Sequence, residues 1–327
     1  MAGGLGFVAL PYRPWPQATE LFMPKASPPE KRSLPLATRE ALWALAFLAI
    51  PLAFFLFIRI WPAFQALWLS LFSWHADPDQ RSFVGLEHYH KMLDDPNLRK
   101  ALQNTLLYTL LGVPTQMALG LLIALMLNAI TRLRDLFRAI YFAPYVTPAA
   151  AIAWVFSWML SPNFGIVNEI LGWFGIPPQP FLTKPSQALA TVTMVVVWQN
   201  LGFQVVLFLA GLQNIPRDYY EAARIDGASP FQLFRHITLP LLNPVMVFSA
   251  VIGTIGFLQL FTQVVNLNFT DQGGPLGSTL TLALYIYQQA FARFDLGYAA
   301  AITVLLFALI LVITLLQLRL LSRRVEY

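Results

Sequence analysis

The stretch that decides how this chain is organised is IPRDYYEAARIDGASPFQLFRHITLP, from Ile215 to Pro240. Pro216 suits a first helical position, because a proline there gives up only an N–H that the helix would leave unpaired. Gly227 supplies a left-handed residue that ends a short helix. Ser229 and Gln232 then have the spacing of a capping box at the start of a second helix. The stretch therefore predicts two short helices joined by a tight turn.

This stretch belongs to a chain that is otherwise strongly apolar. Of 327 residues, 57% are hydrophobic and only 11% are charged, too few polar side chains to cover a soluble globule of this size. A helix needs roughly 20 apolar residues to cross a bilayer. Six segments are long enough, near residues 41–72, 104–128, 138–161, 187–212, 241–265 and 296–321. We predict an all-α membrane protein with six transmembrane helices.

The Lys and Arg residues between these spans indicate which side each loop faces, because short loops rich in both stay in the cytoplasm. The N-terminal tail, the loops at 129–138 and 213–240 and the C-terminal end together hold fourteen, against six on the opposite face. Both termini and the 213–240 loop are therefore predicted to be cytoplasmic. We divide the chain into a cytoplasmic tail at 1–38 and a transmembrane domain at 39–327.

Composition excludes or disfavours several kinds of site. The chain has no cysteine, which excludes disulfides, thiolate metal sites and Cys nucleophiles. His88 and His90 are two positions apart, so on a helix they would point in different directions, and we expect no metal site. The net charge of +5 comes from the membrane flanks, so we expect anionic lipid and no nucleic acid as partner. No phosphate-binding G-x-x-x-x-G-K loop occurs.

The segment before the last span combines a turn with aromatic side chains. The glycines of Asp271–Pro275 permit tight backbone turns at the outer surface. The run Leu280–Phe291 and the residues just after it carry aromatic rings that suit an interfacial helix anchored at the membrane surface, namely Tyr285, Tyr287, Phe291 and Phe294.

The local pattern of the 215–240 stretch leaves two interpretations open. A capped helix with tyrosines, small residues and few charges suits docking into a groove on another protein. The same helix could instead rest on lipid at the inner face of the membrane. Capping and helix propensity do not separate the two.

A resemblance to a known family separates them. The pattern Glu221-Ala-Ala-x-x-Asp226-Gly-Ala, followed by Phe234, Ile237 and Leu239-Pro240, resembles the signature loop of bacterial ABC importer permeases. Supporting motifs are Gly85-Leu-Glu-His-Tyr89, Asn104-Thr105, Gly273-Gly274-Pro275 and Gly297-Tyr-Ala-Ala-Ala301. Over about residues 40–327 the chain is similar to the first permease subunit of the carbohydrate-uptake class, related to maltose, trehalose and glycerol-phosphate systems.

The resemblance implies the type I ABC importer permease fold, with 213–240 as a cytoplasmic helix–turn–helix coupling loop. In that family the short helix after the glutamate inserts into a cleft of the ATPase subunit. The residues of this chain that would make the contact are Glu221, Ala222, Ala223, Asp226 and Gly227. The implied partners are a second permease, two ATPase subunits and an extracytoplasmic sugar-binding protein at the bacterial inner membrane. The chain itself would bind no cofactor, since ATP and Mg²⁺ would bind the partner subunits.

Two features depart from the family pattern. The outer segment between spans three and four lacks the large inserted domain of the maltose-type subunit. Between Phe261 and the Gly-Gly-Pro motif there are two or three extra residues, so the alignment is uncertain over 264–272.

Uncharged polar residues inside the spans mark a candidate substrate pathway, because a lone amide in hydrocarbon is unfavourable unless it faces protein or water. In span five, a polar run from Gln259 to Asn266 has the spacing of one face of a continuous helix. In span four, Asn200 and Gln204 share a face. Amides beside aromatic rings suit the hydroxyls and the apolar ring face of a neutral sugar. The candidates are Trp198, Asn200, Phe203, Gln204, Gln259, Thr262 and Gln263.

The pattern also allows a purely structural role, in which these amides hold helices together. The resemblance favours the pathway, because Trp198, Phe203 and Gln259 lie near positions that contact sugar in related permeases. Basic side chains are missing at depth from spans two to six, which disfavours an anionic substrate. Arg59 in the first span is expected to extend its side chain to the interface.

Two other functions compete with an importer permease. An ion-coupled secondary transporter normally carries Asp, Glu or His inside its spans for the coupling ion, and the predicted spans have none. A membrane enzyme would need a group of such residues with catalytic spacing at a membrane face, and none is present. Both are less favoured than the permease.

Overall fold

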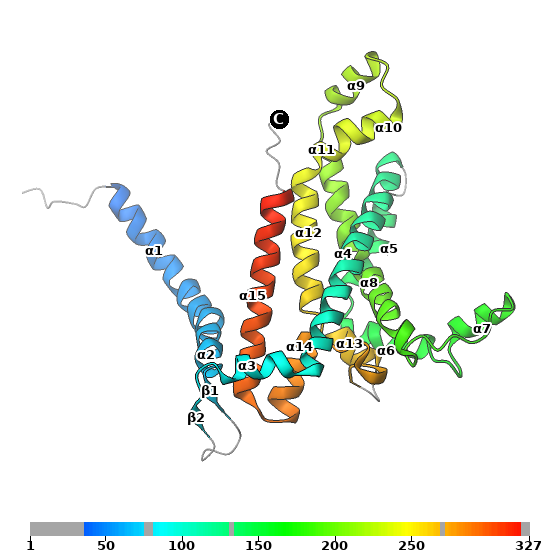
Figure 1. Cartoon of the computed structure of the whole chain (residues 1–327). Coiled ribbons are helices and arrows are strands. Elements are labelled where there is room, and N and C mark those ends of the chain that lie inside the picture. The colour runs from blue at the N-terminus through cyan, green and yellow to red at the C-terminus, as the bar shows by residue number, and fades with distance from the viewer. Residues whose placement is uncertain (1–35, 75–80, 131–133, 269–271, 322–327) are drawn as a thin grey trace, which may run out of the picture. The chain divides into compact units, whose positions relative to one another are not determined.

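The computed structural model describes residues 36–74, 81–130, 134–268 and 272–321 (Figure 1). Nearly all of the predicted tail at 1–38, and the turn residue Asp271, lie outside the described residues. The chain falls into two compact units, Met1–Ile60 and Trp61–Tyr327, which are described separately.

The first unit contains helix α1, Leu36–Phe55, and a π-helical turn η1, Leu56–Ile60. Pro51 lies inside α1, where it removes one backbone donor from the helix ladder. Arg59 belongs to η1. Together with α2, Trp61–Leu69, these elements give the candidate membrane span Trp43–Leu69. The predicted first span at 41–72 is therefore close to the observed one.

The second unit begins with α2 and a short hairpin. Strands β1, Phe72–Ser73, and β2, Ser82–Phe83, pair antiparallel with Phe72 opposite Phe83. Helix α3, Glu87–Asp94, follows. These elements lead the chain to the start of the central helix.

Two long helices form the centre of the second unit: α4, Pro96–Ala129, and α8, Pro185–Gln213. Asp95 caps α4, because its carboxylate accepts hydrogen bonds from the N–H groups of Asn97 and Leu98. Close packing depends on Gly202, where an added Cβ would meet the carbonyl oxygen of Tyr141 on the neighbouring helix. Small residues at such points let membrane helices approach closely.

The third predicted span, 138–161, is broken into two helices. Helix α5, Arg134–Val146, and helix α6, Ala149–Met159, meet at an angle of 93°. Thr147 precedes Pro148, and a residue before proline is disfavoured in the α-helical conformation. The expectation of one continuous helix here was wrong.

The fifth predicted span, 241–265, also differs. Helix α12, Asn243–Leu258, is capped by Gln259. The separate helix α13, Thr262–Leu267, begins three residues after this cap. The carbonyl oxygen of Leu260, released by this break, accepts a hydrogen bond from Thr281 Oγ1 at 2.7 Å. The polar run from Gln259 to Asn266 is therefore not one face of one helix. The predicted register was wrong because a distant threonine stabilises the break.

The 213–240 segment forms the predicted helix–turn–helix. Helix α9, Arg217–Ile225, is followed by α10, Pro230–Leu233. Gly227 has a φ of +82°, and Ser229 and Gln232 form a complete capping box. Pro216 is the N-cap and not the first helical residue, so that position was predicted one residue too far into the helix. The chain continues through η3, Phe234–Thr238, and α11, Leu239–Leu241, into α12 at a bend of 64°.

The remaining elements complete the second unit: α7, Ile166–Trp173; η4, Pro275–Gly277; α14, Leu282–Tyr287; η5, Gln288–Ala292; and α15, Leu296–Leu321. In Figure 1, α9 and α10 lie at one end of the helix bundle, whereas α3, α13 and α14 lie at the other. Tyr285 is 2% exposed, so it is a core residue and not one of the predicted surface anchors.

By length and composition, four helices within the described residues can cross a membrane, or six if each bent pair counts as one span. The four are Trp43–Leu69, Pro96–Ala129, Pro185–Gln213 and Leu296–Leu321. One bent pair, Leu136–Val146 with Ala149–Met159, is the third predicted span. The other, Pro230–Leu241 with Asn243–Leu258, joins the 213–240 segment to α12, which forms most of the fifth predicted span.

Candidate functional site

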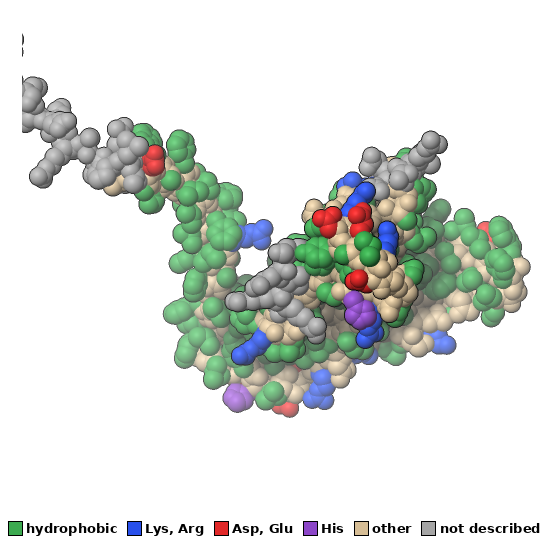
Figure 2. All heavy atoms as spheres, turned by 90° about the horizontal axis from the view of Figure 1, so that it is seen from above, with side chains coloured by type: hydrophobic (Ala, Val, Ile, Leu, Met, Phe, Trp, Pro, Cys, Tyr) green, Lys and Arg blue, Asp and Glu red, His purple; other side chains and the backbone are tan. Residues whose placement is uncertain are grey.

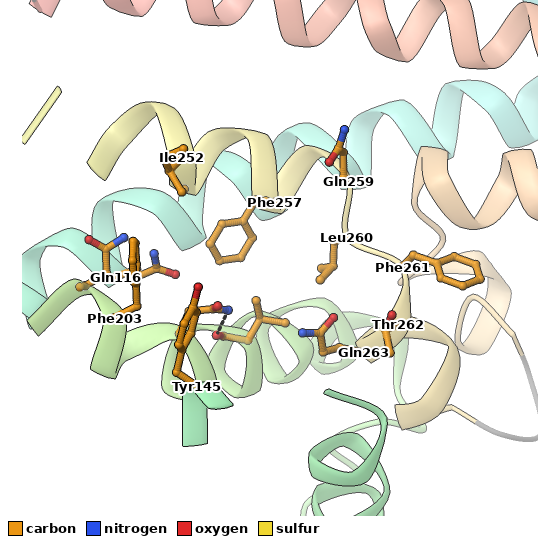
Figure 3. A pocket seen from close by; sticks show the side chains of 15 residues that line it. Gln116, Tyr145, Phe203, Ile252, Phe257, Gln259, Leu260, Phe261, Thr262 and Gln263 are labelled. Atoms are coloured by element: carbon orange, nitrogen blue, oxygen red, sulfur yellow. Dashed lines mark hydrogen bonds between the residues drawn. The ribbon is translucent and has the colours of Figure 1, made fainter. Parts of the chain in front are cut away.

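A cavity of about 330 Å³ lies within the second unit, where both broken spans meet the central helices (Figure 3). Helices α4, α5, α8, α12 and α13 all contribute to it. Fifteen residues line it, and none of them is charged: Gln116, Tyr145, Val196, Asn200, Phe203, Gln204, Ile252, Gly253, Gly256, Phe257, Gln259, Leu260, Phe261, Thr262 and Gln263.

The fold brings six of the seven predicted pathway residues to this cavity: Asn200, Phe203, Gln204, Gln259, Thr262 and Gln263. The amides of span five reach it although their helix is broken. The break replaces the predicted helical face with a short non-helical segment at Leu260 and Phe261, which itself forms part of the wall. Six of the fifteen lining residues are therefore among those predicted, but the geometry that presents them is different.

Gln204 has an unfilled hydrogen-bonding group at the cavity wall. The side chain is fully buried, and its Oε1 accepts a hydrogen bond from Ser249 Oγ at 2.6 Å. Its Nε2 has no partner among the described residues. A buried amide donor without a partner is unfavourable, so this part of the wall carries a polar group that the described residues leave unsatisfied.

Two helices, α5 and α8, contribute a pair of aromatic rings to the cavity. The rings of Tyr145 and Phe203 are stacked, with centroids 5.1 Å apart and planes inclined by 22°. Tyr145 lies in the last turn of α5, just before the 93° bend, and Figure 3 shows it beside Phe203. The bend therefore positions an aromatic ring at the cavity.

A relay of amides ties the two breaks together. Gln263 Nε2 donates to Gln199 Oε1 at 2.9 Å, and Gln199 Nε2 donates to the carbonyl oxygen of Thr147 at 3.4 Å. Thr147 lies at the bend between α5 and α6, and Gln263 lies in the first turn of α13. Gln199, which is 4% exposed, thus connects the bend between α5 and α6 to the first turn of α13.

Two polar or aromatic residues singled out from the sequence lie elsewhere. Trp198 is absent from the cavity wall, is 43% exposed and contacts the ring of Phe156 at 5.0 Å. It lies on a different face of α8 from Asn200 and Gln204. Asn266 accepts a hydrogen bond from Trp154 Nε1 at 2.8 Å, which holds α13 against α6.

Sequence reasoning missed Gln116 and Tyr145. Gln116 is a polar residue inside a span and is 4% exposed, so the rule that selected the amides of span four would also have found it. Tyr145 gave no such signal, because its place at the cavity depends on the broken third span.

The surface at the α9 end of the unit is exposed and mixed in character. Glu221, Ala222 and Asp226 are exposed, as is Ile225 with 86% of its surface accessible. Tyr220 instead turns inward, and its hydroxyl lies 3.0 Å from Thr238 Oγ1, which ties α9 to η3. Figure 2, seen from above, shows acidic and basic side chains beside apolar ones on this face. The predicted coupling residues thus lie on a surface that is open to a partner.

At the other end of the unit, the Asp95 carboxylate joins three helices. Its Oδ2 accepts hydrogen bonds from Tyr285 Oη at 2.6 Å and Tyr298 Oη at 2.7 Å. Burial by itself would raise the pKa of Asp95. The two hydroxyls and the N–H groups of Leu98 and Asn97 favour the charged form more strongly, so the pKa of Asp95 is lowered.

Comparisons with known proteins agree with this architecture. Residues 116–327 match the family described as "Binding-protein-dependent transport system inner membrane component". The sulfoquinovosyl glycerol transport system permease protein SmoG of Agrobacterium fabrum is 34% identical over 301 residues, which cover 90% of this chain and 97% of SmoG. The lactose transport system permease protein LacF of Rhizobium radiobacter is 36% identical over 277 residues, which cover 83% of this chain and 91% of LacF.

A solved structure shares the fold. A chain of a bacterial alginate ABC transporter, in complex with an alginate pentasaccharide-bound periplasmic protein, superposes with a TM-score of 0.74 at 24% sequence identity. The match covers 86% of this chain and 94% of that chain.

Proposed function

Since the chain belongs to the family of binding-protein-dependent transport system inner membrane components, we propose that it forms part of the pathway by which a neutral di- or oligosaccharide is imported. As a family member it is a multi-pass membrane permease, a transport subunit and not an enzyme. The substrate, the residues that contact it and the orientation of the termini are the parts that we add.

The uncharged cavity is the observation that supports a neutral sugar as the substrate. Its amides offer donors and acceptors to hydroxyl groups, and the stacked pair Tyr145 and Phe203 offers a flat apolar surface to a sugar ring. An anionic substrate would be poorly stabilised there, because no Lys or Arg lines the cavity.

The absence of charged residues from the cavity helps to choose between the substrates named for two relatives. LacF is a lactose permease, whereas SmoG is a permease for sulfoquinovosyl glycerol, a sulfonated and therefore anionic glycoside. The cavity of this chain favours the neutral class.

The partners follow from the family and from the exposed α9 surface. We propose a second permease that completes the pathway, two ATPase subunits that bind ATP and Mg²⁺, and an extracytoplasmic sugar-binding protein. The contact with the ATPase would be made by Glu221, Ala222, Ala223, Asp226 and Gly227, on or just after α9. A short exposed helix of this kind suits a groove on a partner protein.

The same surface bears on orientation. ATP is cytoplasmic, so α9 and α10 would face the cytoplasm. Asn243 Nδ2, at the start of α12, donates to the carbonyl oxygen of Leu321 at 3.1 Å, so α15 ends on the α9 side of the bundle. A cytoplasmic C-terminus is consistent with this contact. The charge distribution favours a cytoplasmic N-terminus as well.

Uptake by the reconstituted complex in proteoliposomes tests the proposal. Lactose should accumulate only when ATP is present and should continue to accumulate after ionophores collapse the ion gradients. Sulfoquinovosyl glycerol should enter at least tenfold more slowly. Uptake that needs an ion gradient and no ATP would instead support a secondary transporter, for which the four long described spans offer no Asp, Glu or His.

Reversal of one charge tests the coupling surface. Glu221→Lys should lower ATP-driven uptake at least tenfold while the chain still assembles with the second permease. Glu169→Lys is the matched control, because Glu169 is also exposed and also lies in a short helix, α7. Equal uptake by both variants would contradict the docking role of Glu221.

A further inference from the structure

Three aromatic rings continue outward from the cavity wall. Phe261 lines the cavity at the break between α12 and α13, and in Figure 3 its ring points away from the cluster around Gln263. The ring centroid of Phe261 lies 5.3 Å from that of Tyr287. The ring centroid of Tyr287 lies 5.1 Å from that of Phe291. Phe261, Tyr287 and Phe291 are called the aromatic track below.

The two outer rings of the track, Tyr287 and Phe291, are exposed at the surface. Tyr287 is 42% exposed and Phe291 is 64% exposed. They are four positions apart, at the end of α14 and in η5, so they lie on one side of this segment. Tyr285, on its other side, is buried. The fold thus uses one side of the segment for the core and leaves the aromatic side open.

The segment that carries these rings is held by two side-chain hydrogen bonds near its middle. Tyr285 Oη is bonded to Asp95 Oδ2 at 2.6 Å, which ties α14 to the start of α4. Gln288 Nε2 donates to the carbonyl oxygen of Gln272 at 3.1 Å, which ties η5 to the turn before η4. Ring positions that are held by such bonds lose little conformational freedom when a ligand stacks on them.

We propose that the aromatic track is an outer carbohydrate subsite, on which sugar rings stack before they enter the cavity. Aromatic faces bind the C–H face of a sugar without selecting one hydroxyl pattern, so the rings suit a path more than a specific pocket. The proposal rests on the proposed function, since it assumes that the cavity takes a sugar.

Two other occupants would use the same exposed rings. Lipid would do so if the segment were an interfacial anchor, and the binding protein would do so if it docked here. The inner end of the track favours sugar, because Phe261 belongs to the cavity wall and is continuous with both outer rings.

Cysteine labelling in the complete reconstituted complex separates water from lipid, because the chain has no cysteine of its own. The variants Tyr287→Cys and Phe291→Cys should react with the membrane-impermeant reagent 2-sulfonatoethyl methanethiosulfonate at least tenfold faster than Leu110→Cys. Leu110 is 69% exposed on the apolar helix α4 and serves as the lipid-facing control. Reaction rates as slow as that control would overturn the proposal.

Lactose uptake, measured at saturating binding protein so that weaker docking no longer limits the rate, then separates a sugar path from a docking surface. Tyr287→Ala and Phe291→Ala should each reduce the initial rate at least fivefold, and Tyr287→Phe, which keeps the ring, should lose less than twofold. Phe294→Ala is the control, because Phe294 is 57% exposed and outside the track. Equal losses in Phe294→Ala and Phe291→Ala, or unchanged uptake in both alanine variants of the track, would overturn it. Failure of the unsubstituted complex to carry lactose would count against the proposed function, whereas slow labelling would count against the track alone.

Discussion

At the scale of single residues, Asp95 shows how one side chain can set several elements. It caps α4 through Oδ1 and accepts the hydroxyls of Tyr285 and Tyr298 through Oδ2. Its place directly before Pro96 is visible in the sequence, but nothing in the local sequence points to the two tyrosines, which follow it by 190 and 203 positions. The consequence is that the starts of α4 and α15 are held to α14, the helix that carries Tyr287 of the aromatic track.

The lowered pKa of Asp95 predicts acid sensitivity. A carboxyl whose pKa is lower in the folded state stabilises that state above its unfolded pKa, and this contribution is lost as the pH falls through the folded pKa. Asp95→Asn should lower stability at pH 7 by about 2 kcal/mol, because the charge-assisted bonds are lost. It should also weaken the fall in melting temperature below pH 4, roughly the unfolded value for Asp.

Melting temperatures of the assembled complex at pH 7 and pH 3.5 would check this. Asp94→Asn provides the control, since Asp94 is the exposed neighbour of Asp95. If both variants melted alike at both pH values, Asp95 would not have the role assigned to it.

At the scale of elements, the 213–240 segment is the part of the fold that local chemistry explains best. Gly227 and the capping box at Ser229 and Gln232 were predicted from the sequence, and both are confirmed by the structure. Each depends on residues no more than three positions apart, so the information needed is present in the local sequence. The start and the end of these two short helices can therefore be predicted without knowledge of tertiary contacts.

Two glycines with the same backbone conformation give a matched test of this element. Gly227 and Gly175 have φ values of +82° and +73°, and neither has an atom within 4 Å of an added Cβ. Each alanine substitution should cost roughly 1 kcal/mol of local strain. Only Gly227→Ala should reduce ATP-driven uptake severalfold, because only Gly227 separates α9 from α10. Similar uptake rates in Gly227→Ala and Gly175→Ala would argue against coupling through α9.

At the scale of the whole transmembrane unit, the cavity exists because two spans are broken. The bend between α5 and α6 brings Tyr145 to Phe203, and the break after α12 brings Gln259 and Gln263 to the opposite wall. Gln199 joins both breaks. A bundle of straight helices would have left these side chains on separate surfaces.

The arrangement distinguishes two aromatic residues of α8 that the sequence had placed together. Phe203→Ala should lower the initial rate of lactose uptake at least tenfold, equivalent to about 1.4 kcal/mol or more, because Phe203 lines the cavity. Trp198→Ala should change the rate less than twofold, since Trp198 contacts Phe156 outside the cavity. A loss with Trp198→Ala as large as that with Phe203→Ala would contradict the assignment.

The sequence by itself determined the class of protein, the approximate positions of the spans, the two short helices of the 213–240 segment and the polar residues of α8 and of span five that line the cavity. These follow from composition, from hydrophobic length and from capping, all of which act within about 30 residues of the chain. The family resemblance supplied the transport function. Pro148 also left a local mark at the bend of the third span, although it did not reveal the angle.

Only the tertiary structure decided how the site is assembled. The break at Leu260 is stabilised by Thr281, which lies 21 residues away, and the stacking of Tyr145 on Phe203 joins two different helices. The spacing of polar residues identifies one face of a helix only if the helix is continuous. Whether it is continuous depends on whether a distant group can form hydrogen bonds with the backbone groups that a break leaves unpaired. The physical reason for the difference is therefore that capping is settled by neighbours in sequence, whereas a broken span is settled by neighbours in space.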